Sequence, residues 1–343
     1  MYLHELVTPE ELNELYQTVQ LRYIQTNGTP ELKAAICQLY PGATPDNVLV
    51  TNGSAEANFI TLWRHLEPGD EMVALYPNYL QVPGIARNFG ATVTPVYLKE
   101  SLGWAPDLDE FEAAVTPKTS LIYITNPNNP TGAVLTQAEM ERIVAIADKV
   151  GAWILADEVY RGAELDGDLS PSFWGMYDKV LIVSGLSKAY TLPGLRMGWL
   201  IGPPSVAENA WGYHDYTTIT TGALNDRLAQ LAMRPETRRK ILQRNRDISA
   251  RNLETLTDWL ASHAGMFRFI PPQIGGVAFI GYNRPINSTD LVLKLLHEQS
   301  VLIVPGDAFG VDGYVRVGYG AHNLKPGLGL INNTLQTLTD MEE

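Results

Sequence analysis

The chain has 343 residues, 45% of them hydrophobic, so it can bury a large core and form two lobes. Its formal net charge of −13 opposes nucleic-acid binding, which needs clustered Lys and Arg to displace counterions. The apolar runs are far shorter than the roughly 20 residues of a membrane-spanning helix, and Cys37 is the only cysteine, which excludes an internal disulfide and a cysteine-rich metal site.

The N-terminus, Met1 to Pro9, contains His4 and Glu5 and lacks the basic start and the long apolar stretch of a signal peptide. We therefore expect a cytoplasmic protein that binds neither nucleic acid nor membrane. Residues 1–25 are expected to form an N-terminal segment that packs with a small domain.

Short β-branched runs alternate with helix-period segments between about Val48 and Pro203. This alternation is typical of βα units around a mostly parallel sheet. Ala55 to Leu66 and the stretch from Thr136 to Gly151 are expected helices, and Glu139 completes a capping box with Thr136. The expected strands are Val48 to Thr51, Met72 to Tyr76, Thr92 to Tyr97, Leu121 to Thr125, Trp153 to Ala156, Val180 to Val183 and Met197 to Ile201.

From Asn225 to about His263 the chain becomes helical and charged, and this stretch leads into a second lobe. In that lobe Gly276 to Gly281 and Tyr314 to Gly318 are expected strands. We predict an α/β protein with a large domain, residues 26–230, whose mostly parallel sheet is flanked by helices. A smaller α+β domain, residues 231–343, follows it. The cations of the charged stretch are interpreted as a solvated helix face: Arg238, Arg239, Lys240, Arg244, Arg246 and Arg251.

Three successive expected strands are each followed by unusual polar residues. The first is followed by residues 126–132 (NPNNPTG), the second by Asp157 to Tyr160 (DEVY), and the third by Ser187-Lys188, with Arg196 eight residues beyond the lysine. Ligands of open α/β sheets bind where parallel strands have their carboxyl ends. The sequence therefore predicts a binding site at this edge of the sheet.

This set of motifs resembles the aspartate aminotransferase superfamily, the fold type I enzymes that use pyridoxal phosphate, and within it the class I and II aminotransferases. The likeness runs from Tyr23 to Arg316, with order and approximate spacing kept. Taken singly, the same residues would be a surface lysine, a helix cap, a turn, a core tyrosine and a surface salt bridge. The resemblance implies a pyridoxal 5'-phosphate cofactor, amino acid and 2-oxo acid substrates, and a homodimer with shared active sites.

The expected catalytic residues follow from the resemblance. Lys188 matches the lysine that forms a Schiff base with the cofactor, and its freed amine can move a proton at the substrate's α-carbon. Asp157 matches the aspartate that pairs with the pyridine nitrogen and keeps the ring protonated. Tyr160 and Asn129 match the two residues that hydrogen-bond the ring's phenolic oxygen. Arg316 matches the arginine that binds the substrate's α-carboxylate through two parallel hydrogen bonds, and Asn129 is expected beside the substrate as well.

A phosphate cradle is expected where the strand that ends at Thr51 turns into a helix, because backbone amides at a helix N-terminus point at an anion. The expected cradle residues are Gly53, Ser54 and Ala55, with a hydroxyl from Ser187 and a charge-assisted pair from Arg196.

Two tyrosines complete the expected cofactor site. Tyr79 matches the aromatic residue that stacks on the pyridine ring. Tyr23 resembles the tyrosine that reaches the phosphate in the neighbouring subunit, which implies the dimer.

The chain departs from the family pattern in three places. About 22 residues precede Tyr23, where members usually carry a longer segment that closes over the substrate. Gly185 stands where many members have a second phosphate-binding serine. No arginine matches the one that binds the distal carboxylate in aspartate-specific members, so aspartate is not supported as a substrate.

The leading hypothesis is an aminotransferase, and a lyase, a decarboxylase or a cyclase like the capreomycidine synthases stays open. Substrate-facing residues decide among these reactions. A second class of protein is a cofactor-sensing regulator, which would carry a basic DNA-binding module at its N-terminus. This chain has neither the extra length nor the positive charge that such a module requires. An aromatic run is a further candidate lining of the site, although such runs are more often packing: Trp211, Tyr213, His214 and Tyr216.

Overall fold

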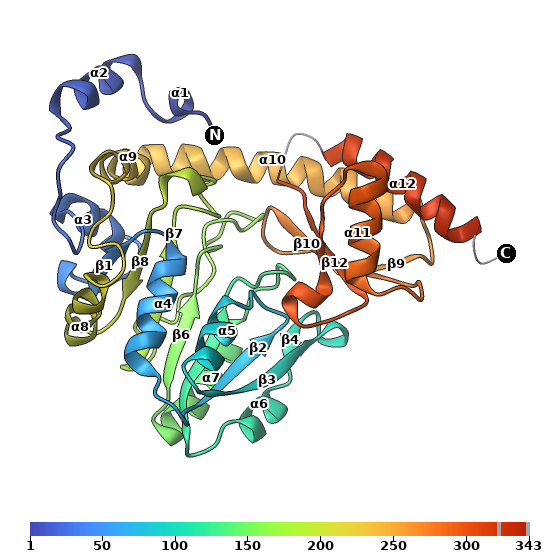
Figure 1. Cartoon of the computed structure of the whole chain (residues 1–343), viewed down its shortest axis with the longest axis horizontal. Helices are drawn as coiled ribbons and strands as arrows, with labels where there is room; N and C mark the ends of the chain where they lie inside the picture. The colour runs from blue at the N-terminus through green and yellow to red at the C-terminus, as the bar shows by residue number, and fades with distance from the viewer. Residues whose placement is uncertain (321–323, 341–343) are drawn as a thin grey trace.

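A computed structural model describes residues 1–320 and 324–340 and places the strands in two sheets (Figure 1). The large sheet has the order β1-β8-β7-β6-β5-β2-β3-β4, and the small sheet has the order β11-β12-β10-β9. The strands of the large sheet are β1 (Val48–Thr51), β2 (Glu71–Tyr76), β3 (Thr92–Lys99), β4 (Ala105–Pro106), β5 (Thr119–Thr125), β6 (Trp153–Asp157), β7 (Val180–Gly185) and β8 (Gly198–Ile201). Those of the small sheet are β9 (Phe267–Phe269), β10 (Val277–Tyr282), β11 (Val304–Pro305) and β12 (Tyr314–Gly318).

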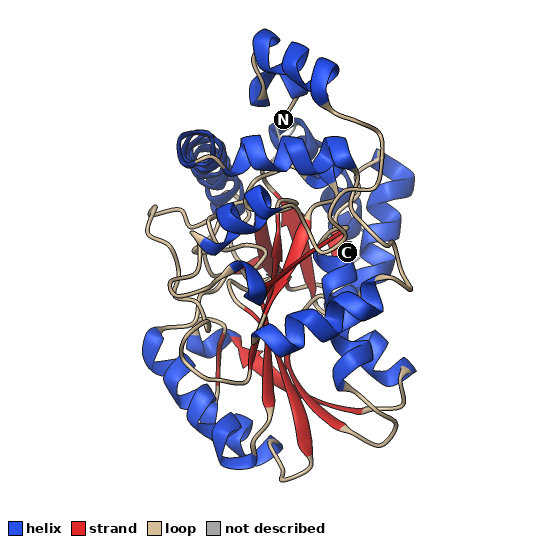
Figure 2. Ribbon diagram, turned by 90° about the vertical axis from the view of Figure 1, so that its left-hand side faces the viewer, coloured by secondary structure: helices blue, strands red, loops and turns tan. Residues whose placement is uncertain are grey.

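Helices lie on both sides of the large sheet (Figure 2). The α-helices are α1 (Leu3–Leu6), α2 (Pro9–Thr18), α3 (Pro30–Cys37), α4 (Ser54–His65), α5 (Gln81–Asn88), α6 (Leu108–Ala114), α7 (Gln137–Val150), α8 (Pro204–His214), α9 (Ala223–Met233), α10 (Pro235–Ala261), α11 (Ser288–Gln299) and α12 (Leu324–Asp340). Short 3₁₀ helices are η1 (Pro45–Asn47), η2 (Glu100–Leu102), η3 (Pro193–Leu195) and η4 (Gly306–Phe309). Within the described ranges, no helix is long and apolar enough to cross a membrane.

The predicted α/β fold with a mostly parallel large sheet is confirmed. Strands β3, β2, β5, β6 and β7 run parallel to one another, whereas β1, β8 and β4 pair antiparallel with their neighbours. The expected capping box is present, since Thr136 accepts from the Glu139 amide, and α7 ends at Gly151 in the left-handed conformation.

The charged stretch predicted as one helical region forms two helices, α9 and α10. Pro235 separates them, because proline lacks an N–H and favours the first helical position. Helix α10 runs along the length of the molecule, from beside α9 to the small sheet (Figure 1). The domain boundaries, and the packing of residues 1–25 with a small domain, stay predictions.

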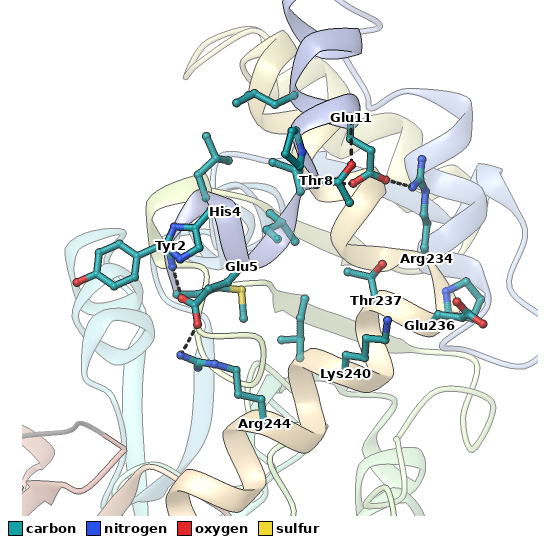
Figure 3. Close-up of a pocket in the computed structure, with 18 residues that line it drawn as sticks. Tyr2, His4, Glu5, Thr8, Glu11, Arg234, Glu236, Thr237, Lys240 and Arg244 are labelled. Atoms are coloured by element: carbon teal, nitrogen blue, oxygen red, sulfur yellow. Dashed lines mark hydrogen bonds and ion pairs between the residues drawn. The ribbon is translucent and has the colours of Figure 1, made fainter.

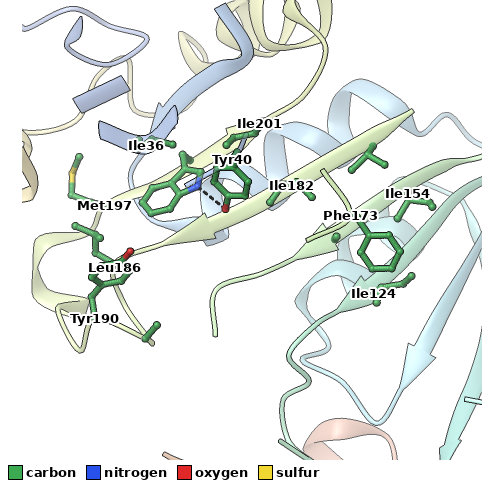
Figure 4. Close-up of a cluster of buried hydrophobic side chains, with 14 of the residues drawn as sticks. Ile36, Tyr40, Ile124, Ile154, Phe173, Ile182, Leu186, Tyr190, Met197 and Ile201 are labelled. Atoms are coloured by element: carbon green, nitrogen blue, oxygen red, sulfur yellow. Dashed lines mark hydrogen bonds between the residues drawn. The ribbon is translucent and has the colours of Figure 1, made fainter. Parts of the chain in front are cut away.

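The central strands are anchored by a continuous core (Figure 4). Ile124, Ile154 and Ile182, from the neighbouring strands β5, β6 and β7, are fully buried together with Phe173. Burying such a side chain contributes roughly 1.5–3 kcal/mol relative to leaving it exposed. The carboxyl ends of these strands therefore hold fixed positions from which polar side chains can project.

The segments that leave these carboxyl ends are also joined to one another. The Asn126 amide donates to the Asp157 carbonyl at 3.0 Å, and the Glu158 amide donates to the Val183 carbonyl at 2.8 Å. The motifs that follow β5, β6 and β7 in the sequence thus meet at one edge of the sheet.

Candidate active site

Asp157 is the last residue of β6, and its carboxylate is buried at the carboxyl edge of the sheet. It accepts hydrogen bonds from the Val159 amide at 3.1 Å and from Asn58 Nδ2 at 3.3 Å. Burial raises the pKa of the Asp157 carboxyl to about 6, although these hydrogen bonds and the charge of Lys188 oppose the rise. A costly buried carboxylate of this kind indicates a functional position rather than a surface charge.

Lys188 lies beside a cavity of about 360 Å³ that is also lined by Tyr160, Ser187 and Arg316. Loss of solvation lowers the pKa of the Lys188 amine. The nearby guanidiniums of Arg316 and Arg196 lower this pKa further, whereas the Asp157 carboxylate opposes the shift. A lowered pKa leaves a larger fraction of the amine unprotonated near neutral pH, and only the unprotonated amine can act as a nucleophile or a base.

Arg316, Asn129 and Tyr160 come together from three elements. Arg316 in β12 donates through Nη1 to Asn129 Oδ1 at 3.0 Å, and its guanidinium lies 5.1 Å from the centroid of the Phe309 ring. Its Nε is buried and has no hydrogen-bond partner among residues 1–320 and 324–340, which leaves a donor available for a ligand. Burial raises the pKa of the Tyr160 hydroxyl to about 12, and Arg316 opposes this effect.

The turn between β1 and α4 is the place where the sequence predicts a phosphate cradle. Gly53 caps α4 with φ of 82°, a backbone conformation that favours glycine. A Cβ atom built on Gly53 would lie 2.4 Å from Arg196 Nη2, so the arginine lies directly against the turn. The amides of Ser54 and Ala55 belong to the first turn of α4, where helix geometry provides no intrahelical acceptor.

Gly185 and Gly198 explain one departure from the family pattern. A Cβ atom on Gly185 would lie 2.7 Å from the Met197 carbonyl oxygen, and one on Gly198 would lie 2.3 Å from Ser54 N. The close approach of β7, β8 and the cradle therefore leaves no room for a serine side chain at position 185.

The two expected tyrosines are exposed. Tyr79 follows β2, and 49% of its surface is accessible. Its backbone amide donates to Asn78 Oδ1 at 2.7 Å, and that oxygen also accepts from the buried Thr125 hydroxyl. Tyr23 is 74% exposed and does not line the cavity beside Lys188.

A larger cavity, of about 1360 Å³, lies elsewhere, between the N-terminal helices and the start of α10 (Figure 3). Ion pairs of Glu5 with Arg244 and of Glu11 with Arg234 connect its two walls. Because none of the expected site residues lines it, we assign the active site to the smaller cavity.

Asn58 was not predicted, although it holds the Asp157 carboxylate. It lies one turn after Ser54 on α4 and is fully buried. The sequence signal that could have identified Asn58 is a polar residue on the apolar, buried face of an amphipathic helix. Of the aromatic run, Tyr213 and Tyr216 contact the Trp63 ring and Trp211 donates to Thr26. None of the four residues of the run lines the cavity beside Lys188.

Comparison with known proteins identifies the family of the chain. The family model of aminotransferase class I and II matches residues 7–325. The chain belongs to this family. The class I and II aminotransferases transfer amino groups, so the prediction of an enzyme of this class is confirmed.

Several members of the family are similar to the chain. An aspartate aminotransferase of Streptomyces avermitilis is 31% identical, over 93% of this chain and 83% of that protein. A capreomycidine synthase of Streptomyces vinaceus is 31% identical, over 90% of this chain and 80% of that protein. The crystal structure of a PLP-dependent aminotransferase from Streptococcus suis has a TM-score of 0.92 and 38% identity, over 98% of this chain and 91% of that one. The predicted fold type I architecture is thereby confirmed.

Proposed function

We propose that this aminotransferase uses pyridoxal 5'-phosphate, carried on Lys188, to move an amino group between an amino acid and a 2-oxo acid. The observation that carries the proposal is that a desolvated amine and a buried carboxylate lie near enough to influence each other electrostatically. Lys188 and Asp157 influence each other's pKa at the carboxyl edge of the sheet, beside the arginine-lined cavity.

The residues fit this cofactor at both of its ends. At the phosphate end, the left-handed Gly53 lets the Arg196 guanidinium approach the turn, and the free amides of α4 face the same place. At the ring end lies the Asp157 carboxylate, whose ionised form is destabilised by burial. A cation that pairs with this carboxylate offsets that cost. A protonated pyridine nitrogen is such a cation.

When bound, pyridoxal phosphate supplies an electron sink for the bonding electrons at the substrate's α-carbon. Lys188 then removes and returns the proton at that carbon, which its lowered pKa suits it to do. Asp157 keeps the pyridine nitrogen protonated. Tyr160 and Asn129 would donate hydrogen bonds to the phenolic oxygen of the bound cofactor, and Tyr79 would stack on its ring.

Arg316 is proposed to bind the substrate's α-carboxylate. Its Nη1 is already oriented by Asn129, and the unpaired, buried Nε supplies a donor. The aromatic face of Phe309 limits the movement of the guanidinium. This arrangement fixes the α-carbon of the substrate relative to Lys188, since both residues line the same cavity.

The first prediction tests the reaction type. An amino donor supplied without a 2-oxo acid should convert the bound cofactor to pyridoxamine phosphate, once per site, after which the reaction stops. The absorption spectrum measures this conversion, with the twenty amino acids, ornithine and arginine as donors. Continuous release of ammonia, carbon dioxide or a cyclised product from one substrate would contradict transamination and favour the lyase, decarboxylase or cyclase alternatives.

A second prediction concerns Arg316. Arg316→Lys should lower kcat/KM by about 10- to 100-fold for every α-amino acid, because a charge-assisted bidentate contact contributes about 1.5–3 kcal/mol and lysine cannot form it. Steady-state kinetics with several donors measures the loss. Arg142→Lys, a surface arginine that pairs with Glu112, is the control and should stay within about twofold of wild type. A loss confined to one donor would mean that Arg316 contacts a side chain instead.

The homodimer, the shared sites and the cytoplasmic location stay predictions. In support of the dimer, large side chains close together in the N-terminal segment are exposed and available to a partner: Tyr16 by 83%, Leu21 by 92% and Tyr23 by 74%.

A further inference from the structure

Glu56 is the third residue of α4, and its carboxylate lies behind the helix N-terminus that we assign to the cofactor phosphate. Only 8% of its side chain is exposed. Its Oε2 accepts from the Asn52 amide at 2.6 Å, and its Oε1 accepts from the hydroxyls of Thr217 and Thr218. The carboxylate thus ties the turn that precedes the cradle to the segment that follows α8.

His214, the last residue of α8, is fully buried beside this carboxylate, with its Nε2 3.4 Å from Glu56 Oε2. Its Nδ1 lies 3.1 Å from the carbonyl oxygen of Thr26. A carbonyl oxygen can only accept a hydrogen bond, so Nδ1 carries a proton.

The neighbours of Thr218 decide the state of the other ring nitrogen. Asn52 Nδ2 donates to the Thr220 carbonyl at 3.1 Å and to Thr218 Oγ1 at 2.6 Å. The Thr218 hydroxyl gives its single proton to Glu56 Oε1 at 2.7 Å. Nε2 of His214, 3.2 Å from Thr218 Oγ1, then faces only acceptors, so it can bond them only as a donor. With both ring nitrogens protonated, His214 forms an ion pair with Glu56.

The ionised form of Glu56 agrees with this assignment. Burial raises the pKa of the Glu56 carboxyl, but the hydrogen bonds from His214, Thr217, Thr218 and the Asn52 amide outweigh it and hold that pKa at about 2. A lone carboxylate in the first turn of α4 would repel a phosphate at the helix N-terminus. A neighbouring imidazolium offsets this repulsion while the carboxylate keeps its hydrogen bonds.

We propose that Glu56 and His214 are positioning residues that set the affinity of the site for the cofactor's phosphate. The pair holds the Asn52-Gly53 turn so that the amides of Ser54 and Ala55 point at the phosphate. The inference rests on the proposed function. Beyond that function, we infer that the affinity for the phosphate depends on the Glu56–His214 ion pair, which is buried and does not itself touch the phosphate.

The test compares two ligands that differ only in the phosphate. Glu56→Gln keeps the side-chain size, removes the charge and leaves an amide where two hydroxyls and a backbone amide donate. We expect the dissociation constant for pyridoxal phosphate to rise at least about tenfold, and that for pyridoxal, which lacks the phosphate, to change by less than about twofold. His214→Gln should give the same phosphate-specific loss, because it leaves the Glu56 charge unpaired. Absorption titration of the cofactor-free full chain measures both constants, and inorganic phosphate serves as a competitor.

The matched control is Glu139→Gln. Glu139 is also the third residue of a helix, α7, and accepts the Thr136 amide at 2.7 Å, yet it lies in a capping box on the surface. This variant should leave both constants unchanged. If Glu56→Gln fails to fold, the same two dissociation constants can be compared in Thr217→Val. That variant removes one hydrogen bond to the carboxylate.

Three results separate the possible failures. Equal weakening of both ligands by Glu56→Gln would show a merely structural role and overturn the inference. Unchanged or tighter binding of pyridoxal phosphate would also overturn it, because repulsion by the carboxylate would then outweigh its positioning. A wild-type protein that does not prefer pyridoxal phosphate over pyridoxal would instead contradict the proposed function.

Discussion

Lys188→Ala is expected to lower turnover by at least about 10⁴-fold. The change removes both the anchor of the cofactor and the base that moves the proton at the substrate's α-carbon, and a positioned general base alone contributes about 10²- to 10⁴-fold. Steady-state kinetics measures the loss. Small primary amines added to the variant should restore part of the activity, since they can carry the proton that the missing side chain no longer moves.

Borohydride reduction gives an independent measurement on the wild type. The peptide that contains Lys188 should gain the mass of the reduced cofactor, and a label on another lysine would contradict the assignment.

Lys179→Ala is the control for the loss of turnover in Lys188→Ala, because Lys179 precedes β7 and donates to the Gly151 carbonyl at 2.8 Å, outside the site. Its turnover should stay within about twofold of wild type.

Seven of the eight strands of the large sheet could be predicted, because most of them are short apolar runs in the sequence. The two-residue strand β4 (Ala105–Pro106) was missed, since it is too short to form such a run. The direction of β8 could not be predicted in this way, since an apolar run has no direction. Strand β8 is antiparallel to β7 because the connection between them carries Lys188 and η3 and holds no α-helix to form a parallel crossover.

Most of the expected site residues could be named because they belong to short motifs at strand ends or at a helix start that resemble the family pattern. Arg316 lies inside β12 and Tyr23 lies in the loop before α3, so only the resemblance pointed to them. The residues that hold the site residues in place could not be predicted, because their contacts join distant parts of the chain. Asn58 bonds Asp157 across 99 positions, and Glu56 bonds Thr218 across 162 positions. Local periodicity carries no information about such contacts.

Asp157→Asn should lower turnover by about 100-fold or more while it stabilises the cofactor-free protein. The two effects have one cause, the burial that raises the pKa of this carboxyl to about 6. An asparagine fits the same space, because it can still accept from the Val159 amide, and Asn58 can turn its unpaired Oδ1 toward the new amide. Turnover falls because asparagine carries no charge to keep the pyridine nitrogen protonated.

The stability gain has a defined pH window. In the unfolded chain the aspartate has an ordinary pKa near about 3.9, whereas in the folded protein the value is about 6. Below about pH 4 the carboxyl is protonated in both states, and the substitution should change stability little. As the pH rises toward 6, the unfolded state ionises first and wild type loses stability, by up to about 3 kcal/mol above pH 6.

Urea unfolding of the two cofactor-free proteins at pH 4 and pH 8 measures this difference. We expect Asp157→Asn to be the more stable protein at pH 8 and nearly equal to wild type at pH 4. Asp148→Asn, an exposed residue of α7, should show no such dependence on pH. If the asparagine variant gained no stability at pH 8, the Asp157 carboxylate would not be held against a desolvation cost. Its readiness to pair with the pyridine nitrogen would then lack the physical basis argued for it.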